Sequence, residues 1–128
     1  MTRTSKNTED PRRYVFVYGT LKRGGGLSSY LTGDHCTYIG DDQVAGRLYD
    51  TGVGFPAMVE PLSERDIVSG EVYAVTPDVL QRLDIVEGCP SLYRRVTLTT
   101  LNTSMSVEGY LYQQPTATMQ PITSGIWS

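Results

Sequence analysis

The chain has 128 residues, which suffices for one domain and excludes two domains of typical size. Its formal net charge is -3, from 11 lysines and arginines against 14 aspartates and glutamates. The strong positive charge that attracts a phosphate backbone is therefore missing, and we expect no nucleic acid partner.

Residues 1–13 are polar and contain no apolar stretch of the kind that directs secretion. We interpret them as a flexible N-terminal arm before a single domain over residues 14–128. No segment is apolar for long enough to cross a membrane, so we expect a cytoplasmic protein with no membrane partner. Cys36 and Cys89 make no disulfide framework, which agrees with a reducing compartment.

The first predicted element is a strand over Tyr14–Tyr18, where a continuous apolar and aromatic run indicates burial on both faces. Three consecutive glycines follow within residues 22–26, and Leu27–Leu31 is long enough for only one or two turns of helix. Val44–Tyr49 and Pro56–Val59 then have the pattern of short strands, separated by glycine turn signals.

The next strand and the main helix meet at one short junction. Val68–Val75 alternates with period 2, which predicts a strand. Thr76 then suits a helix N-cap, Pro77 suits the first helical position, and Asp78 is favoured at the positive end of the helix dipole. The predicted helix runs from Pro77 to at least Leu83.

The last predicted strands are Arg95–Thr100 and Met105–Leu111, and the polar turn between them predicts an antiparallel hairpin. Residues 113–128 predict an extended tail that is anchored by Ile126 and Trp127. Together the elements predict an α+β fold, with a small, mixed, mainly antiparallel, β-barrel-like sheet of about six strands and one main helix.

The residue types that build common metal and catalytic sites are scarce. His35 is the only histidine, which argues against a histidine metal site and against a Ser-His-Asp triad. Cys36 and Cys89 have no partners at zinc-site spacing. The glycines at 24–26 match neither of the common phosphate-binding motifs.

Glu87 is the candidate that the helical period singles out. If the helix continues that far, Glu87 falls within its apolar arc and Asp84 falls at the edge of that arc. The arc is defined by Leu80, Leu83 and Val86. A carboxylate that faces apolar walls has a raised pKa and accepts a proton more readily near neutral pH. A solvated glutamate at a helix end, before a glycine cap, fits the same pattern equally well.

A second candidate site closes the first strand and consists of Tyr18, Gly19, Thr20 and Leu21. A glycine at a strand end frees the backbone, so that successive N–H groups can converge on one anion. A simple turn is the commoner meaning of such a glycine.

Four further side chains are candidates for the walls of a pocket. Tyr93 follows the Glu87 segment, and Tyr112 ends a predicted hairpin strand. Glu71 and Glu108 lie on strand faces where they either face solvent or line a pocket.

Four segments in order carry a family resemblance: VFVYGTLKRG, GEVYAV, LDIVEGCPSLYRR and SGIW. Together they resemble the gamma-glutamylcyclotransferase-like family, particularly its gamma-glutamylamine cyclotransferase branch. The resemblance covers nearly everything from Tyr14 to Trp127.

The resemblance implies a reaction in which the α-amino group of a gamma-glutamyl unit attacks its own side-chain carbonyl, giving 5-oxoproline and a released amine or amino acid. It implies that Glu87 is the proton acceptor, that Tyr18 to Leu21 hold the small-molecule substrate, and that Asp84 has a structural role. No metal or organic cofactor is implied. The alternative is a non-catalytic small-molecule-binding module that keeps the fold and the carboxylate-binding loop. The leaving amine and the oligomeric state stay open.

Overall fold

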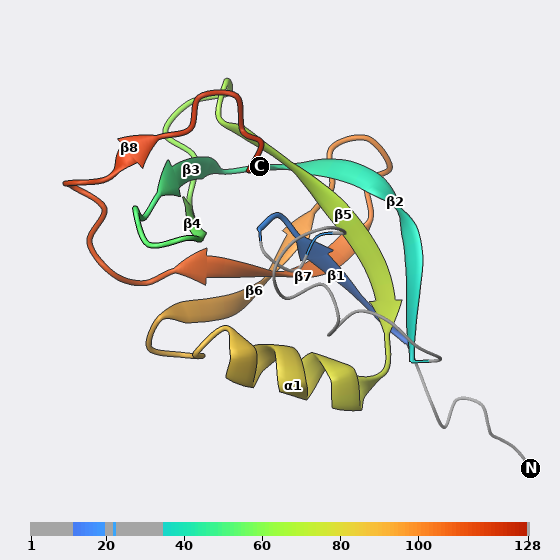
Figure 1. Ribbon diagram of the computed structural model, residues 1–128. Helices are drawn as coiled ribbons and strands as arrows, with labels where there is room; N and C mark the ends of the chain where they lie inside the picture. Colours follow the sequence, from blue (N-terminus) through green and yellow to red (C-terminus); the bar gives the residue numbers. More distant parts are fainter. Residues whose placement is uncertain (1–11, 20–21, 23–34, 128) are drawn as a thin grey trace, which may run out of the picture.

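The computed structural model describes residues 12–19, 22 and 35–127 (Figure 1). Its elements are β1 (Arg13–Val17), β2 (Cys36–Ala45), β3 (Arg47–Asp50), β4 (Pro56–Val59), β5 (Ile67–Val75), α1 (Pro77–Val86), β6 (Tyr93–Thr99), β7 (Ser106–Tyr112) and β8 (Gln120–Pro121). Each predicted strand except Val44–Tyr49 matches an observed strand to within two residues. The short helix predicted at Leu27–Leu31 lies outside the described residues.

The described strands form two sheets. The larger has the order β2-β5-β1-β7-β6, and the smaller has the order β4-β3-β8. β1 and β7 pair in parallel, while the other neighbouring strands pair antiparallel. The α+β fold and the mixed, mainly antiparallel sheet are thereby confirmed. The two sheets do not close into a true barrel, however, and the described part of the chain has eight strands rather than about six.

The predicted strand Val44–Tyr49 is in fact divided between the two sheets. β2 ends at Ala45, β3 begins at Arg47, and Gly46 lies between them. A Cβ atom at Gly46 would lie 2.9 Å from the Met58 Sδ, so glycine lets the backbone pass Met58 closely. The chain leaves the large sheet at this point, and β2 remains an open edge instead of closing a barrel.

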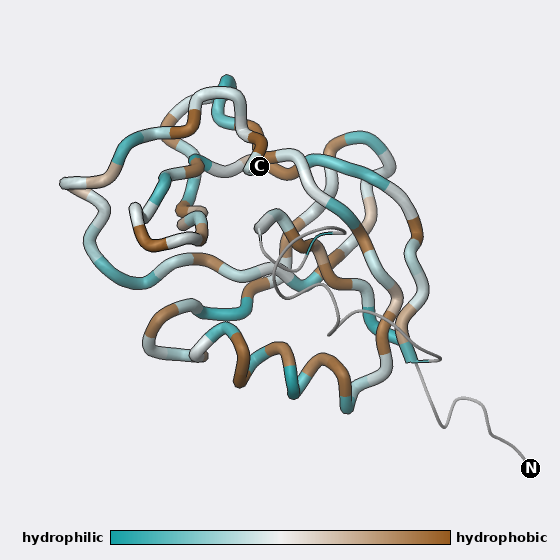
Figure 2. The backbone as a smooth tube through the Cα atoms, in the orientation of Figure 1, coloured by the Kyte–Doolittle hydropathy of each residue, from teal (hydrophilic) through white to brown (hydrophobic). Residues whose placement is uncertain are grey.

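The helix α1 begins as predicted. The Thr76 hydroxyl accepts a hydrogen bond from the Val79 N–H at 3.4 Å, and Pro77 and Asp78 occupy the first turn. Figure 2 shows apolar and polar residues alternating along α1. Among the described residues, no helix has the length and apolar composition that crossing a membrane requires.

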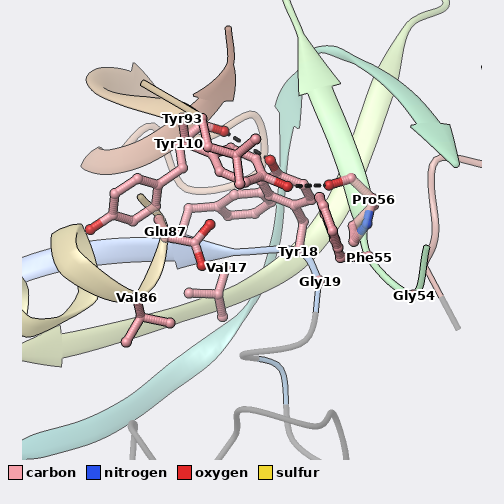
Figure 3. A pocket seen from close by; sticks show the side chains of 12 residues that line it. Val17, Tyr18, Gly19, Gly54, Phe55, Pro56, Val86, Glu87, Tyr93 and Tyr110 are labelled. Atoms are coloured by element: carbon pink, nitrogen blue, oxygen red, sulfur yellow. Dashed lines mark hydrogen bonds between the residues drawn. The ribbon is translucent and has the colours of Figure 1, made fainter. Parts of the chain in front are cut away.

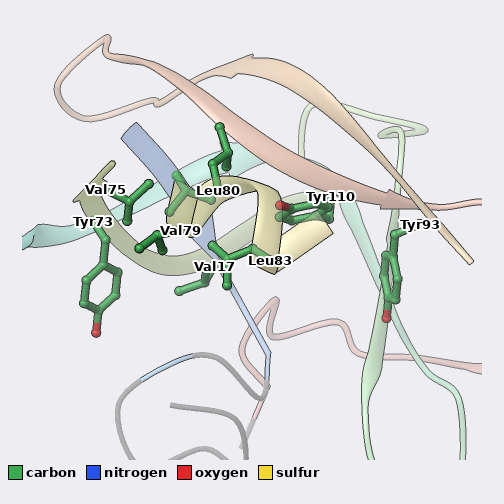
Figure 4. Close-up of a cluster of buried hydrophobic side chains, with 9 residues drawn as sticks. Val17, Tyr73, Val75, Val79, Leu80, Leu83, Tyr93 and Tyr110 are labelled. Atoms are coloured by element: carbon green, nitrogen blue, oxygen red, sulfur yellow. The ribbon is translucent and has the colours of Figure 1, made fainter. Parts of the chain in front are cut away.

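α1 and the small sheet cover opposite faces of the large sheet (Figure 1). Successive residues of β1 point to opposite faces. Val15 and Val17 therefore join the cluster beneath α1, in which Figure 4 labels Val17, whereas Phe16 and Tyr18 pack with Leu48 of the small sheet. This two-sided burial explains the continuous apolar sequence of β1.

The C-terminal segment runs back over the large sheet. β8 pairs with β3, and the Gly125 carbonyl accepts a hydrogen bond from the Ser69 N–H at 2.9 Å. Trp127 packs against the cluster around Phe16, as predicted. Ile126 is 51% exposed, so the prediction that it anchors the tail is wrong.

Candidate active site

The end of α1 determines where the Glu87 side chain lies. Gly88 has a φ of 67°, and its N–H donates to the Ile85 carbonyl at 3.0 Å, while the Cys89 N–H donates to the Asp84 carbonyl at 3.0 Å. This pair of bonds is a Schellman motif, in which glycine takes the left-handed position. Glu87 keeps a helical backbone, with φ of -82° and ψ of -2°, and is the C-cap residue.

The Glu87 carboxylate points into a cavity of about 220 Å³ at the C-terminal end of β1 (Figure 3). The residues that line this cavity come from five elements or from the positions beside them, namely α1, β1, β4, β6 and β7. The lining residues are Phe16, Val17, Tyr18, Gly19, Gly54, Phe55, Pro56, Val86, Glu87, Leu92, Tyr93 and Tyr110. Glu87 is the one Asp, Glu, Lys, Arg or His residue in this described lining. Of the two alternatives for Glu87, the structure therefore favours the carboxylate turned toward apolar walls.

Burial raises the pKa of Glu87 to about 7. The apolar walls cause this shift because they disfavour the charged form. Among the described residues, no side chain forms a hydrogen bond or an ion pair with the Glu87 carboxylate. Both protonation states are populated near neutral pH, so this group can accept a proton and return it.

Tyrosines form fixed walls around the carboxylate. The Tyr18 hydroxyl donates to the Tyr110 carbonyl at 2.9 Å, and the Tyr93 hydroxyl donates to the Pro56 carbonyl. Burial raises the pKa of Tyr18 and of Tyr93, and the nearby Glu87 raises both further. Both hydroxyls therefore stay protonated, and their proton is engaged by a backbone carbonyl.

Gly19 borders the same cavity, and its lack of a side chain is a packing requirement. A Cβ atom there would lie 2.9 Å from the Pro56 ring. Beyond Gly19, Thr20 and Leu21 lie outside the described residues. Lys22 is described, and its N–H donates to the Gly19 carbonyl at 3.0 Å.

Tyr112 does not line the cavity. Its ring packs edge-on against Tyr93, with the two ring centroids 5.4 Å apart. It therefore supports the wall that Tyr93 forms, and any influence on a ligand would pass through Tyr93.

The other carboxylates lie outside this lining. Asp84 accepts a hydrogen bond from the Tyr110 hydroxyl at 2.8 Å and pairs with Arg95 at 3.2 Å. Glu108 pairs with Arg13 at 3.0 Å and with Arg95 at 3.4 Å. These contacts join α1 to the β6–β7 hairpin, which agrees with a structural role for Asp84.

Glu71 is buried and accepts a hydrogen bond from the Tyr73 hydroxyl at 3.0 Å. It lines a second, more polar pocket together with Lys22, Asp41 and Asp42. His35 is exposed and precedes β2. Within residues 12–19, 22 and 35–127, no group of three or more metal-ligating side chains is present.

Several lining residues were missed by the sequence reasoning. Gly54 is one of the glycine turn signals before Pro56–Val59, and the sequence does not indicate that Gly54, Phe55 and Pro56 line the cavity. Tyr110, which also lines the cavity, is 26 residues from its hydrogen-bond partner Asp84 along the sequence. A periodic pattern reports which face is buried, but it does not report which distant segments meet across that face.

Comparisons with known proteins show the family of this chain. Residues 15–128 match the family model described as gamma-glutamyl cyclotransferase, AIG2-like. A Vibrio cholerae protein with a provisional gamma-glutamylcyclotransferase name is 37% identical over 115 residues, which are 88% of this chain and 93% of that protein. Human gamma-glutamylaminecyclotransferase is 38% identical over 95 residues, which are 66% of this chain and 59% of the human protein.

The crystal structure of an AIG2-like protein from Mus musculus has the same fold. It matches with a TM-score of 0.68 and 28% identity, over 83% of this chain and 79% of the mouse chain. The chain belongs to the gamma-glutamyl cyclotransferase, AIG2-like family.

Proposed function

We propose that this protein is a gamma-glutamyl cyclotransferase that converts a gamma-glutamyl amine or gamma-glutamyl amino acid into 5-oxoproline and the released amine. The observation that carries the proposal is Glu87, a carboxylate without a described partner in an apolar cavity, with a pKa raised to about 7. Family membership supplies the reaction type.

In the proposed reaction, the Glu87 carboxylate takes a proton from the substrate α-ammonium group. The resulting amine attacks the γ-carbonyl carbon of the same substrate and forms the new C–N bond of the ring. The tetrahedral intermediate then collapses, and Glu87 returns the proton to the departing nitrogen as the old C–N bond breaks. The ring nitrogen still carries one extra proton, which Glu87 takes and passes to the released amine, so that 5-oxoproline keeps one N–H and the amine leaves as an ammonium ion. One carboxylate thus serves as base and then as acid, and no net proton is consumed.

The cavity contributes by holding the substrate in a folded conformation. Ring closure is intramolecular, so the correct placement of amine and carbonyl lowers the barrier without a second molecule. We place the substrate α-carboxylate at the Tyr18 to Leu21 segment, toward backbone N–H groups, because Gly19 and Glu87 line the same cavity. The α-ammonium group would then lie near the Glu87 carboxylate, which attracts it.

The leaving group is proposed to be a small amine of the kind that the gamma-glutamylamine branch releases. Pockets for small molecules commonly have about 300–1,000 Å³, so a cavity of about 220 Å³ favours a compact substrate. Phe55, Val86 and Leu92 supply apolar contacts. A second carboxylate on the leaving group would meet no Lys, Arg or His among the described lining residues.

The alternative is a module that binds a gamma-glutamyl compound without turnover. The pKa of Glu87 argues against it. A site that only binds an ammonium group works best with a fully ionised carboxylate, whereas a pKa raised to about 7 suits a group that accepts and returns a proton.

The test is incubation of the purified protein with gamma-glutamyl-ε-lysine, gamma-glutamyl alkylamides and several gamma-glutamyl dipeptides. The proposal predicts release of 5-oxoproline from at least one of them. Binding of these compounds with no 5-oxoproline from any would favour the alternative. Glu87→Gln serves as the control for contaminating activity.

We also propose that the protein works in the cytoplasm. The chain has only two cysteines, Cys36 and Cys89, and so lacks the disulfide framework that is common in oxidising compartments. Fractionation of the source cells, followed by detection of the protein, would test this location.

A further inference from the structure

Lys22 joins two segments that are far apart in the sequence. Its Nζ donates a hydrogen bond to the Trp127 carbonyl at 2.7 Å, and its backbone N–H donates to the Gly19 carbonyl at 3.0 Å. Gly19 lines the Glu87 cavity. One residue therefore connects the rim of the cavity to the C-terminal segment.

The C-terminal segment is itself held to the sheets by other bonds. The Ile122 N–H donates to the Leu48 carbonyl at 2.7 Å, and the Gly125 carbonyl accepts from the Ser69 N–H at 2.9 Å. Gly125 has a φ of 72°, and a Cβ atom there would lie 2.0 Å from the Ile67 carbonyl oxygen. Only glycine fits so close to β5, so the segment before Trp127 has a defined position.

The surroundings of Lys22 favour a persistent bond. Its ammonium group is partly buried in the second pocket, which Asp41, Asp42 and Glu71 also line. These three carboxylates contribute negative charge to the pocket, which favours a cation there. A hydrogen bond from a charged donor is stronger than one between neutral groups.

We propose that Lys22 is a positioning residue for the cyclotransferase reaction: through the Trp127 carbonyl it fixes Gly19 at the rim of the cavity, where the substrate α-carboxylate binds. This inference rests on the proposed function. It also explains the closing motif SGIW, in which Gly125 sets the path of the chain and Trp127 supplies the acceptor. Loss of the Lys22 bond should weaken substrate binding and leave proton transfer by Glu87 unchanged.

The kinetic test compares Lys22→Met, which removes the donor, with Lys22→Arg, which keeps a charged donor. Arg65→Met is the control, because Arg65 is an exposed cationic residue outside the Glu87 cavity. Lys22→Met should raise KM about tenfold, while kcat changes less than about twofold and the pH midpoint of kcat/KM does not shift. Lys22→Arg should retain most of the affinity. An unchanged KM in Lys22→Met, or a loss confined to kcat, would overturn the proposal.

A direct contact between Lys22 and substrate is distinguished by removing residues 127–128, which deletes the acceptor. If Lys22 acts through Trp127, the effects of this truncation and of Lys22→Met on KM will not add. Additive effects would mean that Lys22 binds the substrate itself, and the positioning role would be wrong.

Failure of the proposed function is recognised separately, as a wild-type protein that forms no 5-oxoproline. The Lys22 bond is then tested by fluorescence, because Trp127 is the only tryptophan. Lys22→Met should increase acrylamide quenching of Trp127 and Lys22→Arg should not. Equal quenching in wild type and Lys22→Met would overturn the inference. If the truncated chain does not fold, the same comparison of acrylamide quenching tests the bond between Lys22 and Trp127.

Discussion

Asp84 lies in the last turn of α1, and Glu87 follows three residues later at the helix C-terminus. Asp84 accepts a hydrogen bond from the Tyr110 hydroxyl and forms an ion pair with Arg95, so its negative charge is compensated. Glu87 faces an apolar cavity, and burial raises its pKa to about 7. Two carboxylates on one short segment thus have opposite environments. The comparison separates a group that holds the fold together from a group that is available to move a proton.

The largest expected effect is the loss of turnover in Glu87→Gln. Glutamine keeps the size of the side chain but cannot accept the proton, so kcat should fall by about 10²- to 10⁴-fold. Binding of 5-oxoproline, measured by calorimetry, should persist. Asp84→Asn is the matched variant and should retain kcat to within about tenfold. The assignment is wrong if Asp84→Asn loses turnover while Glu87→Gln keeps it.

The second expected effect concerns stability at the compensated carboxylate. Asp84→Ala leaves the buried Tyr110 hydroxyl without its acceptor, which should lower the free energy of unfolding by about 1–3 kcal/mol. Urea unfolding of Asp84→Ala, Tyr110→Phe and the double variant forms a cycle that isolates this bond. Equal stability of wild type and Asp84→Ala would show that the contact contributes nothing.

The third effect has the opposite sign, because Glu87→Gln should stabilise the protein above pH 7. The pKa of folded Glu87, about 7, lies above the ordinary value of 4.5, so its ionised form is disfavoured in the folded state. Stability is therefore lost as the pH rises from 4.5 through 7, and glutamine avoids that loss. The expected gain at pH 8 is on the order of 1–2 kcal/mol once partial exposure is allowed for, and it should vanish near pH 4. A gain of equal size at both pH values would exclude ionisation as its cause.

The smallest expected effect is that of His35→Ala. His35 is exposed and does not line the cavity, so the variant should keep the wild-type pH profile. In both proteins kcat/KM should rise with pH through about 7, as Glu87 becomes ionised. Activity on one gamma-glutamyl substrate across a pH series checks this, after both proteins are shown to be folded. Disappearance of the ascending limb in His35→Ala would make the histidine the titrating base.

The features that the sequence predicted well depend on neighbours along the chain. Thr76 and Pro77 begin α1 because capping involves residues within one turn. The two-sided burial of β1 follows from its continuous apolar run. The side of the helix on which Glu87 lies also followed from the period, although the pattern alone left a solvated glutamate equally possible.

The features that escaped prediction depend on contacts between distant segments. Gly46 divides a predicted strand because Met58 packs against it, and Gly19 needs its missing side chain because Pro56 lies against it. Tyr112 was expected in the pocket wall, but its position behind Tyr93 is decided by the pairing of β6 and β7. None of these partners is specified by local spacing.

The most direct test of the central claim is the titration of the Glu87 carboxyl group itself. Protein with ¹³C-labelled glutamate carboxyl groups can be followed by NMR from pH 3 to pH 9, and Glu87→Gln identifies the resonance by its absence. The account predicts a midpoint of about 7 for Glu87, coincident with the rise in kcat/KM. A midpoint near the ordinary value of 4.5 would contradict it, because the carboxylate would then be solvated rather than held in an apolar cavity.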